Sequence, residues 1–183
     1  MKKLLLLGAG AQGSTVAKRM NEEPDVSEIV CADYDETAVK EMERTLEKAT
    51  ALQLDATRVD NIVKAAQGVD LMINALPIVL TPNALAAALE ANVCYQDFAA
   101  AEFEGIPFDR GIELLLTEWS DKFEAAGLSA LISTGSAPGL ANIITRETAE
   151  KMDTCDTIQI HLYEGIWAKR FLPFWWSPEV AYG

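Results

Sequence analysis

The sequence predicts an α/β domain built on a doubly wound parallel sheet. Short apolar runs typical of buried strands alternate with helical patterns from residue 3 to about residue 152, as expected for a parallel sheet covered on both faces. Gly8, Gly10 and Gly13 form a G-x-G-x-x-G run directly after the first apolar run. An acidic residue, Asp33, follows twenty positions beyond Gly13, at the end of the next apolar run. Together these observations favour a fold that binds a ligand at the turn between its first strand and first helix.

The glycine run carries the strongest functional signal in the chain. In such a run the first glycine allows a tight turn, the second lets the backbone approach a pyrophosphate, and the third lets helix and strand pack closely. Ala11 and Gln12 lie within the run, at the start of the predicted helix Ala11–Met20. Backbone amides at a helix start hold phosphates. The pattern therefore predicts a dinucleotide-binding domain of the Rossmann type.

The acidic residue bears on which dinucleotide is bound. A carboxylate at Asp33 would accept hydrogen bonds from both hydroxyls of the adenosine ribose, and it would repel a 2'-phosphate. This favours NAD. Lys18, Arg19 and Lys40 lie close in sequence and keep NADP as the alternative.

Composition limits the other classes of function. The 183 residues hold one complete domain of about 100 to 150 residues and little more. A net charge of −13 disfavours binding to nucleic acid or to an anionic membrane, and no apolar stretch is long enough to span a bilayer. Cys31, Cys94 and Cys155 are scattered, which fits a reduced, cytoplasmic setting, and with His161 they lack the spacing of metal ligands.

The elements follow in alternating order. We expect strands at 4–7, 29–32, 51–54, 69–76, 93–97 and 128–133. Besides the first helix, we expect one that begins after a cap at Asp35 and carries Val39, Met42, Leu46 and Ala49, followed by helices carrying 59–66 and spanning 82–91, 114–126 and 138–152. Thr81 is the expected cap of the helix that starts at Pro82.

A domain boundary is expected near Asp153. Thr157–Ile166 is predicted as a new strand, so residues 1–152 form the dinucleotide-binding domain and residues 153–183 begin a second α/β domain. The aromatic-rich segment Trp167–Gly183 would be hard for an isolated domain to cover. We therefore expect the remainder of a substrate and dimerisation domain to be absent from this chain. The alternatives are that the aromatic segment folds back as core or is buried in a dimer interface.

Four segments together carry a resemblance to a known family. They are Gly8-Ala9-Gly10-Ala11-Gln12-Gly13, Asn74-Ala75-Leu76-Pro77, Tyr95-Gln96-Asp97 and Ser136-Ala137-Pro138-Gly139-Leu140-Ala141-Asn142. With them the chain resembles the saccharopine dehydrogenase family, and it is similar to lysine 6-dehydrogenases and carboxynorspermidine dehydrogenases. The likeness extends into Trp176-Ser177-Pro178-Glu179. It implies oxidation or reduction of a carbon–nitrogen bond by a nicotinamide cofactor, through an imine, on an amino-acid or polyamine derivative, in a homodimer formed through the second domain.

The resemblance also suggests where the cofactor would lie. Asn74, Ala75, Leu76 and Pro77 would border the ribose and nicotinamide half, and a plain strand terminus is the competing interpretation. Asp55 follows the third strand and would contact adenine, although an acid in an exposed turn is equally compatible with the sequence. The same part of the cofactor site would include two neighbouring residues, Tyr34 and Ala56.

Three residues are predicted to face the substrate. Asp97 ends the fifth strand, where a carboxylate could hold an ammonium group or stabilise an iminium ion, unless it is a turn aspartate. Ser136 and Asn142 belong to a loop that offers a hydroxyl, an amide and a helix start to a substrate carboxylate. The competing interpretation is that Pro138 and Gly139 only shape a turn.

No general base is assigned by the sequence. The only histidine, His161, lies in the predicted boundary strand and is interpreted as structural, which disfavours a hydroxy-acid dehydrogenase. No Tyr-x-x-x-Lys pattern occurs, which disfavours a short-chain dehydrogenase. Lys169 and Glu164 are open candidates for a proton acceptor. The alternative function is a non-catalytic dinucleotide-binding module that regulates or assembles with a partner.

Overall fold

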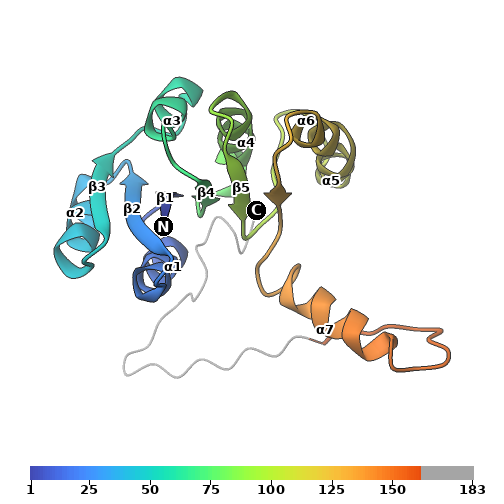
Figure 1. Ribbon diagram of the computed structural model, residues 1–183. Coiled ribbons are helices and arrows are strands. Elements are labelled where there is room, and N and C mark those ends of the chain that lie inside the picture. The colour runs from blue at the N-terminus through green and yellow to red at the C-terminus, as the bar shows by residue number, and fades with distance from the viewer. Residues whose placement is uncertain (162–183) are drawn as a thin grey trace, which may run out of the picture.

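A six-stranded parallel sheet forms the centre of the protein, in the order β3-β2-β1-β4-β5-β6 (Figure 1). The computed structural model describes residues 1–161. The strands are β1 Lys2–Leu7, β2 Val26–Asp33, β3 Ala49–Gln53, β4 Leu71–Asn74, β5 Cys94–Asp97 and β6 Ala130–Leu131. The strand order reverses beside β1, so the point where ligands of doubly wound sheets bind lies at the carboxyl ends of β1 and β4.

Helices lie on both faces of this sheet. They are α1 Ala11–Glu22, α2 Glu36–Thr45, α3 Val59–Ala65, α4 Thr81–Glu90, α5 Phe108–Leu114 and α6 Ser120–Ala125. A further helix, α7 Leu140–Ala149, follows the last strand. A 3-10 turn, Ile78–Leu80, precedes α4, and a π-helical turn, Leu115–Trp119, joins α5 to α6.

The leucine run of β1 explains why the sheet needs both layers. Leu4 and Leu6 point into one core, which includes Ala17 of α1 and Val39 of α2. Leu5 and Leu7 point into the opposite core, with residues of α3, α4 and α6. Each of these leucines is at most 3% exposed. Full burial of such a side chain contributes about 1.5–3 kcal/mol, so a run without polar alternation is stable only when both faces are covered.

The doubly wound parallel sheet expected from the sequence is confirmed, with differences at the element ends. Asp35 caps α2 as predicted, since its carboxylate accepts from the amides of Thr37 and Ala38. The prediction that this helix extends to Ala49 was wrong, because Ala49 begins β3 and pairs with β2.

Two later elements also differ from expectation. The sixth strand is limited to Ala130–Leu131, and the helix before it begins at Phe108, six residues earlier than predicted. Thr81 does not cap α4; it lies within the first turn, where its hydroxyl accepts a hydrogen bond from Asn74. A buried polar partner has displaced the local capping role that the sequence suggested.

The last described helix, α7, extends away from the sheet (Figure 1). None of its residues is buried, and Leu140, Ile143 and Ile144 are each more than half exposed. Residues 157–161, the described part of the predicted boundary strand, form no strand, and His161 is exposed there rather than structural. Several predictions concern residues that the structure does not describe. These are the rest of that strand, the candidate proton acceptors Glu164 and Lys169, the segment 176–179 and the aromatic segment.

Two further observations apply to residues 1–161. No helix in this range combines the length and the apolar character needed to cross a membrane. No group of three or more His, Cys, Asp or Glu side chains in the same range is arranged to hold a metal ion.

Candidate dinucleotide site

The three glycines of the G-x-G-x-x-G turn face different surroundings. Gly8 has a φ of +96°, and a Cβ there would lie 2.7 Å from the carbonyl oxygen of Ala75. A Cβ on Gly13 would collide with the carbonyl oxygen of Gly8. Gly10 has no atom within 4 Å of its Cβ position. Gly8 and Gly13 therefore allow β1, α1 and β4 to approach closely, whereas Gly10 leaves open surface for a ligand.

The start of α1 faces this open surface. Ala11 and Gln12 are exposed and, with Gly13, form the first turn, whose amides have no partner within a helix. The turn contains no acidic side chain that would compete for these amides. A 12-residue helix with an open N-terminus and a glycine cap suits a pyrophosphate.

Asp33 lies at the carboxyl end of β2 and is held against the glycine turn. Its Oδ2 accepts from the amide of Ala9 at 2.6 Å, and its Oδ1 accepts from the amide of Asp35 at 2.9 Å. The side chain is only partly buried. Because a carboxylate has about four acceptor positions, two remain for hydroxyl groups of a bound ribose.

The residues predicted near adenine lie at the ends of β2 and β3. Tyr34 is 80% exposed, and its carbonyl oxygen accepts from the side chain of Gln53 at 3.1 Å. Asp55 is exposed, and its Oδ1 accepts from both the hydroxyl and the amide of Thr57, two hydrogen bonds that lower the pKa of the carboxyl. Ala56 is buried. Asp55 thus shapes the turn into α3 and also faces solvent.

The turn after β4 is held by one buried side chain, that of Asn74, and the residues that follow it are more exposed. The Asn74 side chain is 2% exposed; its Oδ1 accepts from the Leu76 amide at 3.1 Å. Its Nδ2 donates to the Tyr95 hydroxyl at 2.9 Å and to Thr81 at 3.2 Å. Ala75 lies against Gly8, and Pro77 is exposed. Asn74 therefore orients the turn from beneath, and the backbone of Ala75 to Pro77 borders the switch point.

Asp97 is buried at the carboxyl end of β5, with 2% of its surface exposed. Its Oδ1 accepts from the Ser133 amide at 2.6 Å, and its Oδ2 accepts from the Tyr95 hydroxyl at 3.0 Å. Burial raises the pKa of the Asp97 carboxyl to about 6, against the opposing effect of these two hydrogen bonds. Because both oxygens point into the protein, the carboxylate does not open onto the surface.

Ser136 lies on the exposed turn that leads into α7, and Asn142 is exposed in the first turn of that helix. Asn142 Oδ1 accepts from the Gly139 amide at 3.0 Å, so this side chain helps to start the helix. The same turn is tied to β5, because the Thr134 amide and hydroxyl both donate to the carbonyl oxygen of Asp97. The structure thus brings the Gly8 turn, Asp33 and Ala75 together, and holds the Ser136 turn beside the end of β5.

Three contributors to this region were missed from the sequence: Tyr95, Thr81 and Ser133. Tyr95 and Asp97 are two positions apart in a strand and so share one face, which is a signal that could have indicated their contact. The contacts made by Thr81 and Ser133 join distant segments and had no local signal.

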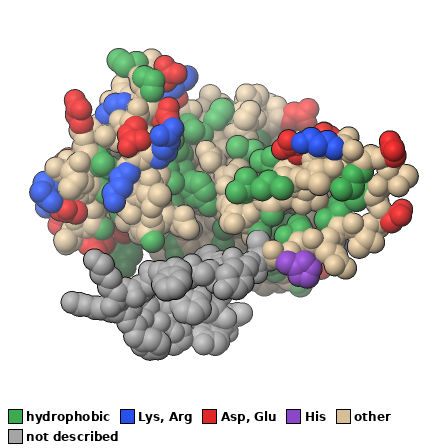
Figure 2. Space-filling model, turned by 90° about the horizontal axis from the view of Figure 1, so that it is seen from below, with side chains coloured by type: hydrophobic (Ala, Val, Ile, Leu, Met, Phe, Trp, Pro, Cys, Tyr) green, Lys and Arg blue, Asp and Glu red, His purple; other side chains and the backbone are tan. Residues whose placement is uncertain are grey.

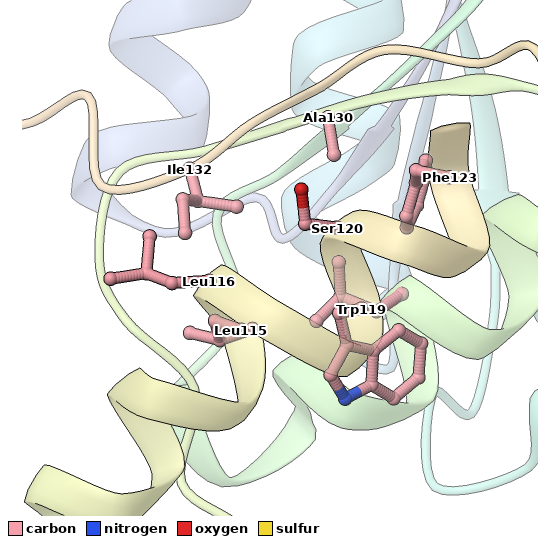
Figure 3. Close-up of a pocket in the computed structure, with 8 residues that line it drawn as sticks. Leu115, Leu116, Trp119, Ser120, Phe123, Ala130 and Ile132 are labelled. Carbon is pink, nitrogen blue, oxygen red and sulfur yellow. The ribbon is translucent and has the colours of Figure 1, made fainter. Parts of the chain in front are cut away.

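A small hollow lies elsewhere, between the α5–α6 helical segment and the edge of the sheet (Figure 3). Its volume is about 130 Å³, and its lining residues are Leu85, Leu115, Leu116, Trp119, Ser120, Phe123, Ala130 and Ile132. This lining is almost entirely apolar and includes none of the predicted site residues. The hollow is therefore separate from the predicted cofactor site at the glycine turn.

A parallel sheet with a glycine turn at its switch point, an open helix start and an acid after the second strand defines a dinucleotide-binding domain of the Rossmann type. Comparison with known families narrows this class. The model of the saccharopine dehydrogenase NADP binding domain matches residues 4–131. The chain belongs to this family, and its domain is an NAD(P)-binding one.

Two relatives of known name have similar sequences. Carboxyaminopropylagmatine dehydrogenase from Synechocystis sp. is 35% identical over 155 residues, which cover 79% of this chain and 37% of the relative. Carboxynorspermidine synthase from Vibrio cholerae is 27% identical over 180 residues, which cover 86% of this chain and 43% of the relative. The chain therefore spans less than half the length of these two relatives.

Solved structures support the fold. Apo saccharopine dehydrogenase (L-Glu forming) from Saccharomyces cerevisiae superposes with a TM-score of 0.68 at 18% identity, over 82% of this chain and 31% of that chain. Apo scyllo-inositol dehydrogenase from Lactobacillus casei gives a TM-score of 0.63 at 10% identity, over 82% of this chain and 42% of that chain. At these identities the likeness establishes the architecture.

The division of labour among the glycines leads to a first prediction. Gly13→Ala will lower the free energy of unfolding by about 2 kcal/mol or more, because the added methyl group collides with the Gly8 carbonyl. Gly10→Ala will change it by about 0.5 kcal/mol or less, yet weaken NADH about tenfold by filling the space that a pyrophosphate needs. Urea unfolding and calorimetric titration of both variants measure the two effects. Equal stability of the two variants would contradict this assignment.

The burial of Asp97 leads to a second prediction, on pH. A carboxyl whose pKa rises on folding from 3.8 to about 6 contributes stability that is complete below pH 3.8 and is lost as the pH rises through about 6. Between about pH 5 and about pH 7 this loss amounts to about 1 kcal/mol. Urea unfolding of wild type and Asp97→Asn at both pH values should show the loss in wild type and its absence in the variant. The same pH dependence in both proteins would exclude a raised pKa at Asp97.

Proposed function

We propose that this domain belongs to an NAD(P)-dependent oxidoreductase that acts on a carbon–nitrogen bond of an amino-acid or polyamine derivative, through an imine. The observation that carries the proposal is the open face at Gly10 and the start of α1, beside Asp33, in a chain of the saccharopine dehydrogenase family. The names of two relatives, a carboxyaminopropylagmatine dehydrogenase and a carboxynorspermidine synthase, support a polyamine-related amine as the substrate class.

We further infer that NAD is the preferred cofactor. Two acids, Asp33 and Asp35, lie close together at the end of β2, where a 2'-phosphate would be repelled. Two of the cations that kept NADP open have acidic partners: Arg19 pairs with Glu22 and Glu23, and Lys40 pairs with Glu36. Figure 2 is consistent with this pairing, since charges of both signs lie intermixed on the side of the molecule that carries α2.

The proposed mechanism assigns binding and orientation to the residues of this chain. When bound, a nicotinamide cofactor supplies or accepts the hydride. The first amides of α1 hold its phosphates, and Asp33 accepts from its ribose hydroxyls. Tyr34, Asp55 and Ala56, which follow β2 and β3, would border the adenine. These contacts together fix the orientation of the dinucleotide along the carboxyl edge of the sheet.

The reactive end is assigned to the next two loops. The backbone from Asn74 through Ala75 and Leu76 to Pro77, held by the Asn74 side chain, would border the nicotinamide half. Ser136 and Asn142 offer a hydroxyl and an amide to a substrate carboxylate. Asp97 is also proposed to serve this side of the site, but its burial favours an action through the loop that it holds over direct contact with an ammonium group.

The proposal extends to the oligomeric state and the cell compartment of the whole protein. We propose a homodimer formed through a second, substrate-binding domain that begins near Asp153, working in the reducing cytoplasm. The support for a reducing compartment is that Cys31, Cys94 and Cys155 are all free.

The first experiment is a parallel calorimetric titration of the chain with NADH and NADPH at one salt concentration, followed by turnover assays of the extended protein with amino-acid and polyamine amines. We expect tighter binding of NADH and turnover on an amine. Binding without turnover would favour a non-catalytic dinucleotide-binding module. Binding of neither cofactor would overturn the proposed site.

A charge reversal tests the cofactor preference. Asp33→Arg should weaken NADH about tenfold or more and strengthen NADPH relative to it, because a cation replaces the ribose acceptor and attracts a 2'-phosphate. Asp121→Arg on α6, which changes the net charge equally but lies on an exposed helix, is the matched control and should leave both affinities unchanged. An unchanged ratio of affinities in Asp33→Arg would remove Asp33 from the cofactor site.

A further inference from the structure

The buried polar side chains of residues 1–161 form one connected group. They are Asn74, Thr81 and Asp97, each at most 2% exposed. The hydroxyl of Tyr95, a residue that is itself 1% exposed, links Asn74 to Asp97, and Thr81 joins the group through Asn74. No buried side-chain nitrogen or oxygen in this range lacks a partner. Burying polar groups is costly unless they are paired, so a single satisfied network at one place in an otherwise apolar core calls for a specific explanation.

Along the chain from Asn74 to Asp97, each side chain donates a hydrogen bond to the next. Asn74 Nδ2 donates to the Tyr95 hydroxyl at 2.9 Å, and that hydroxyl donates to Asp97 Oδ2 at 3.0 Å. Burial, and next the charge of Asp97, raise the pKa of Tyr95 well above its ordinary value, so the phenol keeps its proton. The Tyr95 ring packs against Phe123 with ring centroids 6.3 Å apart. The hydroxyl is thus held between two strand ends by a ring that is fixed in the core.

Each end of the network holds the backbone of a different loop. At one end, Asn74 Oδ1 accepts from the Leu76 amide, in the turn proposed to border the nicotinamide. At the other end, Asp97 Oδ1 accepts from the Ser133 amide, at the start of the loop that carries Ser136. Ser133 has a φ of +56°, which a non-glycine residue adopts only when its surroundings hold it there. The two loops are more than fifty residues apart in sequence, and Tyr95 is the residue between them.

We propose that Tyr95 is a positioning residue of the proposed active site, whose hydroxyl couples the cofactor-bordering turn 74–77 to the substrate loop 133–142. In this arrangement Asp97 acts through the Ser133 loop and does not contact substrate. This inference rests on the proposed function for its catalytic meaning. The coupling itself is a property of the folded chain and is measurable without any ligand.

The first test uses backbone amide shifts of the 183-residue chain, followed by NMR between about pH 4 and about pH 8. Titration of Asp97, whose pKa lies at about 6, should move the Ser133 amide directly and the Leu76 amide through Tyr95 and Asn74, with the same midpoint. In Tyr95→Phe the Ser133 amide should still titrate and the Leu76 amide should not. A Leu76 amide that fails to titrate in wild type, or that titrates equally in both proteins, would overturn the coupling.

The second test measures whether the coupling serves the reactive end of the cofactor. ADP-ribose lacks the nicotinamide, so it reports the adenosine half alone. Tyr95→Phe should weaken NADH about three- to tenfold while leaving ADP-ribose within about twofold, since the two hydrogen bonds of the hydroxyl, to Asn74 and to Asp97, are lost beneath the nicotinamide turn. Asp97→Asn should lower the ratio of NADH to ADP-ribose affinity in the same direction. The double variant Tyr95→Phe/Asp97→Asn should lower this ratio by less than the product of the two single-variant factors.

A matched variant separates positioning from general destabilisation. Phe123→Leu removes the aromatic partner of the Tyr95 ring but leaves every hydrogen bond of the network in place. It should lower the thermal midpoint and leave the ratio of NADH to ADP-ribose affinity unchanged. Two results would show that Tyr95 has only a structural role. One is a shift of the affinity ratio in Phe123→Leu as large as the shift in Tyr95→Phe, and the other is an equal loss of affinity for NADH and ADP-ribose in Tyr95→Phe. Failure of wild type to bind either ligand would instead contradict the proposed cofactor site, and the amide titration would still decide the coupling.

Discussion

The close approach of β1, α1 and β4 is the constraint on which the rest of the structure depends. It occurs where Gly8, Gly13 and Ala75 meet, with no room for a Cβ at either glycine. A side chain at Gly13 would push α1 away from the sheet, and with it the helix amides that face the cofactor surface. The same contact fixes the turn after β4 against the turn after β1. In the proposed site, the turn that would bind the phosphates and the turn that would border the nicotinamide are therefore positioned by one packing contact.

The leucines of β1 provide the energetic basis for that contact. Their alternate burial in two cores requires helices on both faces, and this requirement places β1 at the centre of the sheet. The strand order then reverses beside β1, which opens the carboxyl edge between β1 and β4. The apolar core thus creates the site without contributing a polar group to it.

The polar network at the carboxyl ends of β4 and β5 differs physically from the apolar core. Its members gain little net stability from hydrogen bonding, because water would satisfy the same groups in the unfolded chain. What the network provides is a definite geometry, since a buried donor or acceptor that loses its partner is costly. Asn74, Tyr95 and Asp97 therefore restrict the two neighbouring loops to one arrangement. The proposed oxidoreductase function would need such restriction where cofactor and substrate meet.

The sequence by itself determined the architecture, the glycine turn, the acid after β2 and the family. These signals are local: apolar runs, a fixed glycine spacing and short motifs. It failed where a residue's role depends on a distant partner. Thr81 has the chemistry of a helix cap, yet its hydroxyl bonds to Asn74, and Ala49 has the spacing of a helix residue, yet it pairs in β3. Asp97 showed a similar limit, because an acid at a strand end has the same sequence pattern whether it faces solvent or the Ser133 amide. Only the tertiary structure decided these cases, since long-range packing and the cost of unpaired buried groups outweigh the local preferences that a sequence reveals.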